Sequence, residues 1–134
     1  LLQQLNSQIK GNNLESNIIL VTDFLDRKVV EVLLQSVDVN ILAYVDTAGE
    51  SASAAVEKTL ASFNPTIVTN IKAFEELNNE VLKINNNSPE LIVNAVIELL
   101  EDKNKAEQIV VAAKLNIEQS SYVNKALETL SFYH

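Results

Sequence analysis

Short apolar runs alternate with stretches of helical periodicity along most of the chain. Four of these runs are rich in β-branched residues, which predicts strands at Asn17–Thr22, Val39–Val45, Thr66–Thr69 and Val81–Ile84. Between and after them, apolar residues recur at the spacing of one helix face. These stretches predict helices over residues 1–9, 27–36, 51–63, 71–77, 89–101, 105–119 and 120–132.

Strands that alternate with helices are typical of an α/β fold with a parallel sheet. We therefore expect a Rossmann-like domain with a parallel sheet of about four strands, flanking helices and three consecutive helices at its end. The alternative is a helical bundle in which Ile18–Val37 forms one long helix. The aspartate-flanked run VNILAYVD and the proline-bounded run TIVT count against this alternative.

The segment Val39–Asn70 is the centre of this pattern, because it reads as strand, polar loop, helix and strand in direct succession. In a parallel sheet such a unit places its loop and the amino end of its helix at the carboxyl edge of the strands. Open α/β folds bind their ligands at that edge. We therefore expect a binding site near Gly49–Ser53.

Several residues mark where the helices begin and end. Ser88, Pro89 and the following glutamate predict a helix start, since they supply an N-cap, a first-turn proline and an acid near the positive helix end. Pro65 ends the preceding helix and favours an extended conformation at the residue before it. Ser120-Ser121 predicts the cap of a separate last helix.

Composition and charge exclude several classes of function. The 134 residues suffice for one domain with a real core. A net charge of −8, with ten scattered lysines and arginines, disfavours nucleic-acid binding and direct docking on an anionic membrane. The sequence has no cysteine, which excludes disulfides, thiolate catalysis and cysteine-bound zinc and fits a reducing cytoplasm. It also lacks methionine, and we expect it to be a piece of a longer protein.

Four segments follow one another in a distinctive order: Val32–Leu42, Gly49–Ser53, Ala61–Asn70 and Asn87–Asp102. In this order they resemble the carboxyl-terminal, donor-binding half of GT-B glycosyltransferases, of the retaining family 4 or group 1 type. The resemblance extends over nearly the whole chain. Its most specific part is the closing helix, which opens on Pro-Glu and ends on Leu-Leu-Glu-Asp.

The resemblance implies an enzyme that transfers a sugar from a nucleotide diphosphate sugar to an acceptor, with retention of configuration. Residues 1–134 would form a single, partial nucleotide-sugar-binding domain of that larger enzyme. Its partner would be the acceptor-binding N-terminal domain of the same protein. The resemblance implies no coordinated metal, and the sequence shows no cluster of histidines and aspartates that would argue for one.

The family carries two glutamates with seven residues between them, the first near the donor sugar and the second on the ribose. Alignment on Pro65 places the first glutamate at Glu50, which becomes the candidate catalytic residue. The second position holds Lys58. Glu57 lies one position away, which turns its side chain by ~100° on a helix. Phe63 stands where the family has a glycine before the proline turn.

The candidate diphosphate site lies at the start of the central helix. Backbone amides there point outward, and the helix dipole favours an anion. A glutamate before them is able to stabilise positive charge that develops at the anomeric carbon. The structural alternatives are ordinary capping serines and a solvated loop acid. The amides in question belong to Ser51, Ala52, Ser53 and Ala54.

Three further side chains are candidate donor contacts. Lys58 would touch the ribose or a phosphate, and the alternative is a solvated helix lysine. Asp23 and Phe24 follow the first predicted strand, in a region that lines the nucleobase pocket of the family. The alternative for these two is a plain connector with Phe24 in the core.

Two other functions remain open at this stage. The missing second glutamate and glycine are compatible with a non-catalytic glycosyltransferase-like domain that binds or stabilises a partner. A receiver-like signalling domain is the third reading, with Asp46 as its central aspartate. No acidic pair ends the first predicted strand, and three closing helices do not fit a receiver.

Overall fold

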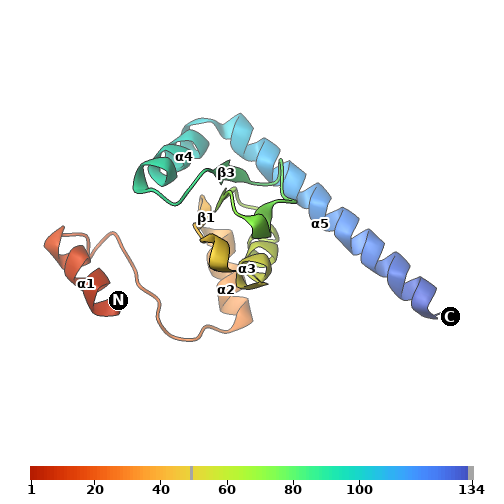
Figure 1. The fold of residues 1–134 in the computed structure, drawn as a ribbon, viewed down its shortest axis with the longest axis horizontal. Coiled ribbons are helices and arrows are strands. Elements are labelled where there is room, and N and C mark those ends of the chain that lie inside the picture. The colour runs from red at the N-terminus through yellow and green to blue at the C-terminus, as the bar shows by residue number, and fades with distance from the viewer. Residues whose placement is uncertain (49, 133–134) are drawn as a thin grey trace.

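The computed structural model describes residues 1–48 and 50–132 and is shown in Figure 1. The side chains it leaves undescribed are those at positions 48, 50, 51, 121–125, 128, 131 and 132. The elements in chain order are α1 (Leu2–Gly11), α2 (Arg27–Ser36), β1 (Asn40–Leu42), the 3₁₀ helix η1 (Asp46–Ala48), α3 (Glu50–Leu60), β2 (Thr66–Thr69), the 3₁₀ helix η2 (Lys72–Phe74), β3 (Leu82–Ile84), α4 (Pro89–Glu101) and α5 (Lys103–Phe132).

The strands form a parallel sheet in the order β1-β2-β3. Asn40 pairs with Thr66 across β1 and β2, and Ile67 pairs with Leu82 across β2 and β3. All residues of the central strand β2 are buried, because helices cover both faces of the sheet. Burial on both faces explains why its sequence TIVT is β-branched without alternation. The predicted parallel α/β fold is confirmed, and the helical-bundle alternative is wrong.

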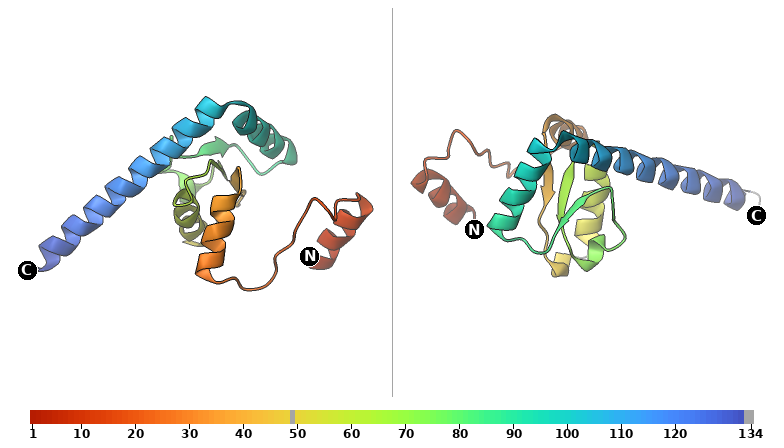
Figure 2. Two further views of the ribbon diagram at one scale, coloured as in Figure 1. Left: turned by 180° about the vertical axis from the view of Figure 1, so that it is seen from behind. Right: turned by 90° about the horizontal axis from the view of Figure 1, so that it is seen from above.

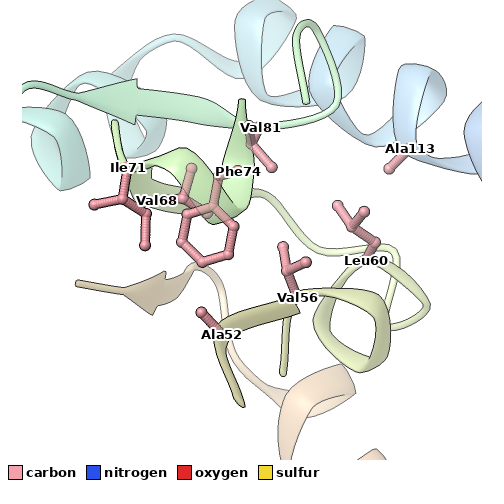
Figure 3. Packing of buried hydrophobic residues seen from close by; sticks show 8 residues of the cluster. All are labelled: Ala52, Val56, Leu60, Val68, Ile71, Phe74, Val81 and Ala113. Carbon is pink, nitrogen blue, oxygen red and sulfur yellow. The ribbon is translucent and has the colours of Figure 1, made fainter. Parts of the chain in front are cut away.

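Two apolar clusters lie on opposite faces of the sheet. Ile67 points to the face covered by α4, where it packs with Ala95 and Leu99. The next residue, Val68, points to the other face, as successive strand residues do. It belongs to the cluster shown in Figure 3, whose other members are Ala52, Val56, Leu60, Ile71, Phe74, Val81 and Ala113. The first half of α5 joins both clusters, through Ile109 on one side and Ala113 on the other.

Several predicted elements are confirmed, with boundaries close to those expected. α2 and β2 have the predicted limits. α4 begins as predicted: the Ser88 hydroxyl accepts a hydrogen bond from the backbone N–H of Leu91 at 3.3 Å, and Pro89 occupies the first turn. The predicted strand at Val39–Val45 is shorter, because the chain leaves the sheet after Leu42 and turns into η1. The predicted helix over 71–77 is reduced to η2.

The sheet of the described chain has three strands rather than about four. Asn17–Thr22 is not a strand, and its apolar residues from Ile18 to Val21 are all exposed. A strand gains its stability from pairing and from a covered face. This segment has neither, since it runs apart from the sheet together with α1 (Figures 1 and 2).

The prediction of three consecutive closing helices is also wrong, because two helices follow β3. α5 is one helix of 30 residues that includes Ser120. Serine within a helix costs only a fraction of a kcal/mol relative to alanine, about 0.5, and no glycine or proline lies nearby to end the helix. None of the described helices combines the length and the hydropathy that crossing a membrane requires.

Candidate functional site

The carboxyl ends of the three strands define one edge of the sheet, where the segments leading to α3, η2 and α4 begin. η1, which follows β1, lies beside η2, which follows β2. A loop that enters a helix therefore meets a second loop at the edge where open α/β sheets bind ligands. This is the location that the sequence predicted for the site.

Two hydrogen bonds fasten the segment between β1 and α3 to the end of β2. The Thr69 hydroxyl donates to the carbonyl oxygen of Tyr44 at 2.5 Å, and the backbone N–H of Lys72 donates to Asp46 Oδ1 at 3.1 Å. The Tyr44 ring also stands edge-on to the Phe74 ring, with centroids 6.3 Å apart. From the sequence, Asp46 was considered as the central aspartate of a receiver-like domain, and Thr69 was not singled out. Both partners are distant in the sequence, so no local spacing could have revealed the contacts.

The predicted diphosphate site at the amino end of α3 is only partly described by the structure. Gly49 and the side chains of Glu50 and Ser51 lie outside the described part of the structure, so the catalytic role of Glu50 stays a prediction. Ala52 is buried in the core beneath the helix. It therefore offers a ligand only its backbone. Ser53 and Ala54 are exposed on the outer side of α3.

An open groove of about 1010 Å³ lies between residues 21–25, α2 and the outer side of α3. Four of the predicted donor contacts line it, although they come from segments far apart in the sequence: Asp23, Phe24, Ala54 and Lys58. Phe24 is fully exposed, so the alternative that placed it in the core is wrong. Asp23 and Phe24 also do not follow a strand, because residues 17–22 are not paired.

The groove offers both charge signs beside apolar walls. Glu57 lines it together with Lys58, so the neighbouring acid, which helix geometry turns away by ~100°, reaches the same space. Sequence reasoning had set this acid aside. Across the groove, Arg27 and Glu31 of α2 form an ion pair at 3.2 Å. The apolar walls come from Val30, Leu34 and Ala61.

Such a groove is able to accept a flat, partly apolar group between its walls. The carboxylate of Glu57 accepts hydrogen bonds from hydroxyls, and the ammonium of Lys58 attracts an anion. Among the residues that the structure describes, no group of three or more histidines, aspartates and glutamates is placed to hold a metal ion.

The sheet, its order and the loop–helix unit at the carboxyl edge define a Rossmann-like α/β domain. Among solved structures, the chain is similar to the C-terminal domain of a group 1 glycosyltransferase family protein (LpcC) from Francisella tularensis, with a TM-score of 0.66 and 18% sequence identity. The match covers 81% of this chain and 55% of that chain, so this chain spans about half the length of the domain it matches. No family model and no curated protein matches the sequence. The fold implied by the sequence resemblance is confirmed.

Proposed function

We propose that the chain is the donor-binding part of a cytoplasmic glycosyltransferase, which transfers a sugar from a nucleotide diphosphate sugar to an acceptor. The observation that carries this proposal is the fold, which the chain shares with a group 1 glycosyltransferase domain over 81% of its length. A separate N-terminal domain of the same protein binds the acceptor. The placement of the candidate residues around one groove and one helix end supports the same conclusion.

The nucleoside of the donor occupies the groove between α2 and α3. Its base lies near Asp23 and Phe24, and Glu57 accepts hydrogen bonds from the ribose hydroxyls in place of the family's second glutamate. The amides of 51–54 hold the diphosphate at the positive end of α3. Lys58 lies in the last turn of α3 and contacts the ribose from there. The proposal thus assigns to Glu57 a role that the one-residue offset had left open.

During the proposed reaction, negative charge develops on the leaving diphosphate and positive charge on the sugar ring. The bond between the anomeric carbon and the diphosphate oxygen breaks, and its electron pair leaves with the diphosphate, which the amides stabilise. Glu50 stabilises the positive charge on the sugar ring. The acceptor hydroxyl then attacks from the face that the nucleotide leaves and gives its proton to the departing diphosphate oxygen, so the configuration is retained. No metal takes part in this scheme.

Isothermal titration of the full-length protein with UDP, GDP and ADP tests the proposal. We expect saturable binding of one of the three nucleotides and clear preference over the other two. Absence of binding by all three would contradict a donor-binding domain. Mass spectrometry of an acceptor incubated with the matching sugar nucleotide then tests the transfer itself.

A second candidate function is a non-catalytic domain that keeps the fold for binding a partner. The lysine at position 58, where the family has its second glutamate, favours it. This candidate predicts that the nucleotide titrations are flat while the full-length protein co-purifies with an active glycosyltransferase.

A further inference from the structure

The segment between β1 and α3 is held at a point close to the start of α3. Asp46 Oδ1 accepts a hydrogen bond from the backbone N–H of Lys72 at 3.1 Å, across 26 positions of the sequence. Three residues separate Asp46 from Glu50, the first residue of α3, so at most about 14 Å of extended chain joins the two. The position of Asp46 therefore limits where the amino end of α3 lies.

The other partner of this bond, η2, is fixed to the body of the domain. Phe74 of η2 is fully buried and belongs to the same apolar cluster as Ala52 and Val56 of α3 (Figure 3). Just before η2, the Asn70 N–H donates to the Ile84 carbonyl of β3 at 2.8 Å. Because a buried side chain and a backbone bond both hold it, η2 is a firm support for the segment that Asp46 fastens to it.

Asp46 lies closer to α3 than the other bond that holds this segment. The Thr69 hydroxyl fastens Tyr44, two residues after β1, whereas Asp46 is two residues further along the chain. The charge of Asp46 has the wrong sign to attract a diphosphate, because both are anionic. Its contribution to such a site therefore lies in its acceptor oxygen, which an asparagine would also supply.

We infer that Asp46 is a positioning residue of the donor site: its hydrogen bond to Lys72 fastens η1 to η2 and thereby fixes the amino end of α3. The proposed function places Glu50 and the amides of 51–54 at this end. Groups that stabilise a developing charge are most effective when they are held in place beforehand. The effect on donor binding rests on the proposed function, whereas the fixing of α3 does not.

Hydrogen exchange of the full-length protein without nucleotide tests the fixing of α3. We expect Asp46→Ala to accelerate exchange by at least about tenfold at the Lys72 amide and at residues 54–56, whose amides make the first helical bonds of α3. Asp46→Asn keeps the acceptor and should exchange like the natural protein. The matched control is Asp38→Ala, at an exposed position before β1, which should change neither site. Unchanged exchange in Asp46→Ala, or equal acceleration in β2 and α4, would overturn the inference.

Nucleotide titration tests the consequence for the donor site. The probe is whichever of UDP, GDP and ADP the natural protein binds most tightly. We expect Asp46→Ala to raise its Kd about fivefold or more, and Asp46→Asn to restore it to within about twofold of the natural value. If Asp46→Asn weakens binding as much as Asp46→Ala, the charge acts instead of the bond and the inference is wrong. If the natural protein binds none of the three, the proposed function fails, while exchange at residues 54–56 still decides whether Asp46 fixes α3.

Discussion

Phe63 has a backbone φ of 59°, in the left-handed region that favours glycine. Its N–H donates to the Leu60 carbonyl at 3.3 Å where α3 ends, and Lys114 Nζ lies 5.3 Å from its ring centroid. The family resemblance places a glycine at this position, and the backbone here has the conformation that such a glycine would serve.

Comparison of two substitutions isolates the backbone strain at Phe63. Phe63→Gly and Phe63→Ala both remove the ring, but only glycine relieves the left-handed conformation, which costs other residues about 1–2 kcal/mol. We expect Phe63→Gly to have a free energy of unfolding about 1 kcal/mol higher than Phe63→Ala. Urea unfolding of the two variants measures this difference in free energy, provided that their m-values are equal. An alanine variant as stable as the glycine variant would contradict the positive φ.

Glu57 provides the sharpest test of the proposed ribose contact. Glu57→Gln removes the charge at nearly constant size, and hydrogen bonds to charged groups contribute about 1.5–3 kcal/mol. We therefore expect the Kd of the bound nucleotide to rise by about tenfold or more. The control is Glu75→Gln, an exposed acid that does not line the groove, and it should leave the Kd unchanged. Equal effects of both variants would argue for long-range charge instead of contact.

At the residue scale, sequence reasoning found what local order determines. Asp23, Ala54 and Lys58 were predicted, and the groove brings them together. It did not find Glu57, because the position of a residue on a helix does not show how much of the helix surface faces the groove. It also did not find Thr69, because its bond to Tyr44 joins residues that are far apart in the chain.

The loop between β1 and α3 depends on the buried hydroxyl of Thr69. Thr69→Val keeps the shape but leaves the Tyr44 carbonyl without this donor, which we expect to cost about 1–2 kcal/mol of unfolding free energy. Thr59→Val is the matched control. Thr59 is equally buried and donates to the Ala55 carbonyl at 2.8 Å, but that carbonyl keeps its helical N–H donor. Chemical denaturation of both variants should show the larger loss for Thr69→Val, and the opposite order would contradict the tether.

Two amide side chains hold the end of α2: Asn40 Nδ2 donates to the Leu34 carbonyl at 3.4 Å, and Asn64, from the turn before β2, makes shorter contacts. Asn64 Nδ2 donates to the carbonyls of Leu34 and Gln35 at 2.8 and 2.9 Å. Asn64→Asp replaces this donor with a negative charge at the negative helix end, and we expect a loss of about 2 kcal/mol. Asn79→Asp makes the same charge change at an exposed position and should cost less than about 0.5 kcal/mol. Thermal unfolding of the two variants tests this expectation. Equal shifts in the unfolding temperature would mean that the added charge alone lowers the stability.

At the element scale, the sequence predicted the elements with strong local signals. Ser88-Pro89 marks the start of α4, and the β-branched TIVT bounded by Pro65 marks β2. Asn17–Thr22 has an equally strong composition but no strand, because pairing depends on a neighbour that composition does not reveal. Ser120 did not end a helix, since a capping residue acts as a cap only where the helix ends for another reason.

The whole molecule is built around β2, with one apolar cluster on each side of it. α4 closes one cluster and α3 closes the other, and the first half of α5 contacts both. Glu80, which is buried, also joins α5: its Oε2 accepts from Asn116 Nδ2 at 3.5 Å. The contacts that hold α5 to the body therefore lie between Lys105, which pairs with Glu98, and Ile117.

The second half of α5 extends beyond the rest of the molecule in Figure 1. Its described side chains include Leu127 and Leu130, each 58% exposed. Removal of residues 120–134 should therefore change the free energy of unfolding by less than about 1 kcal/mol, while the helical circular dichroism signal falls with the lost residues. A cut after Gln108 is the control, because it also removes Ile109 and Ala113 from the two clusters and should abolish cooperative unfolding. If the shorter deletion were as damaging as the longer one, the outer half of α5 would pack against the body, contrary to its position here.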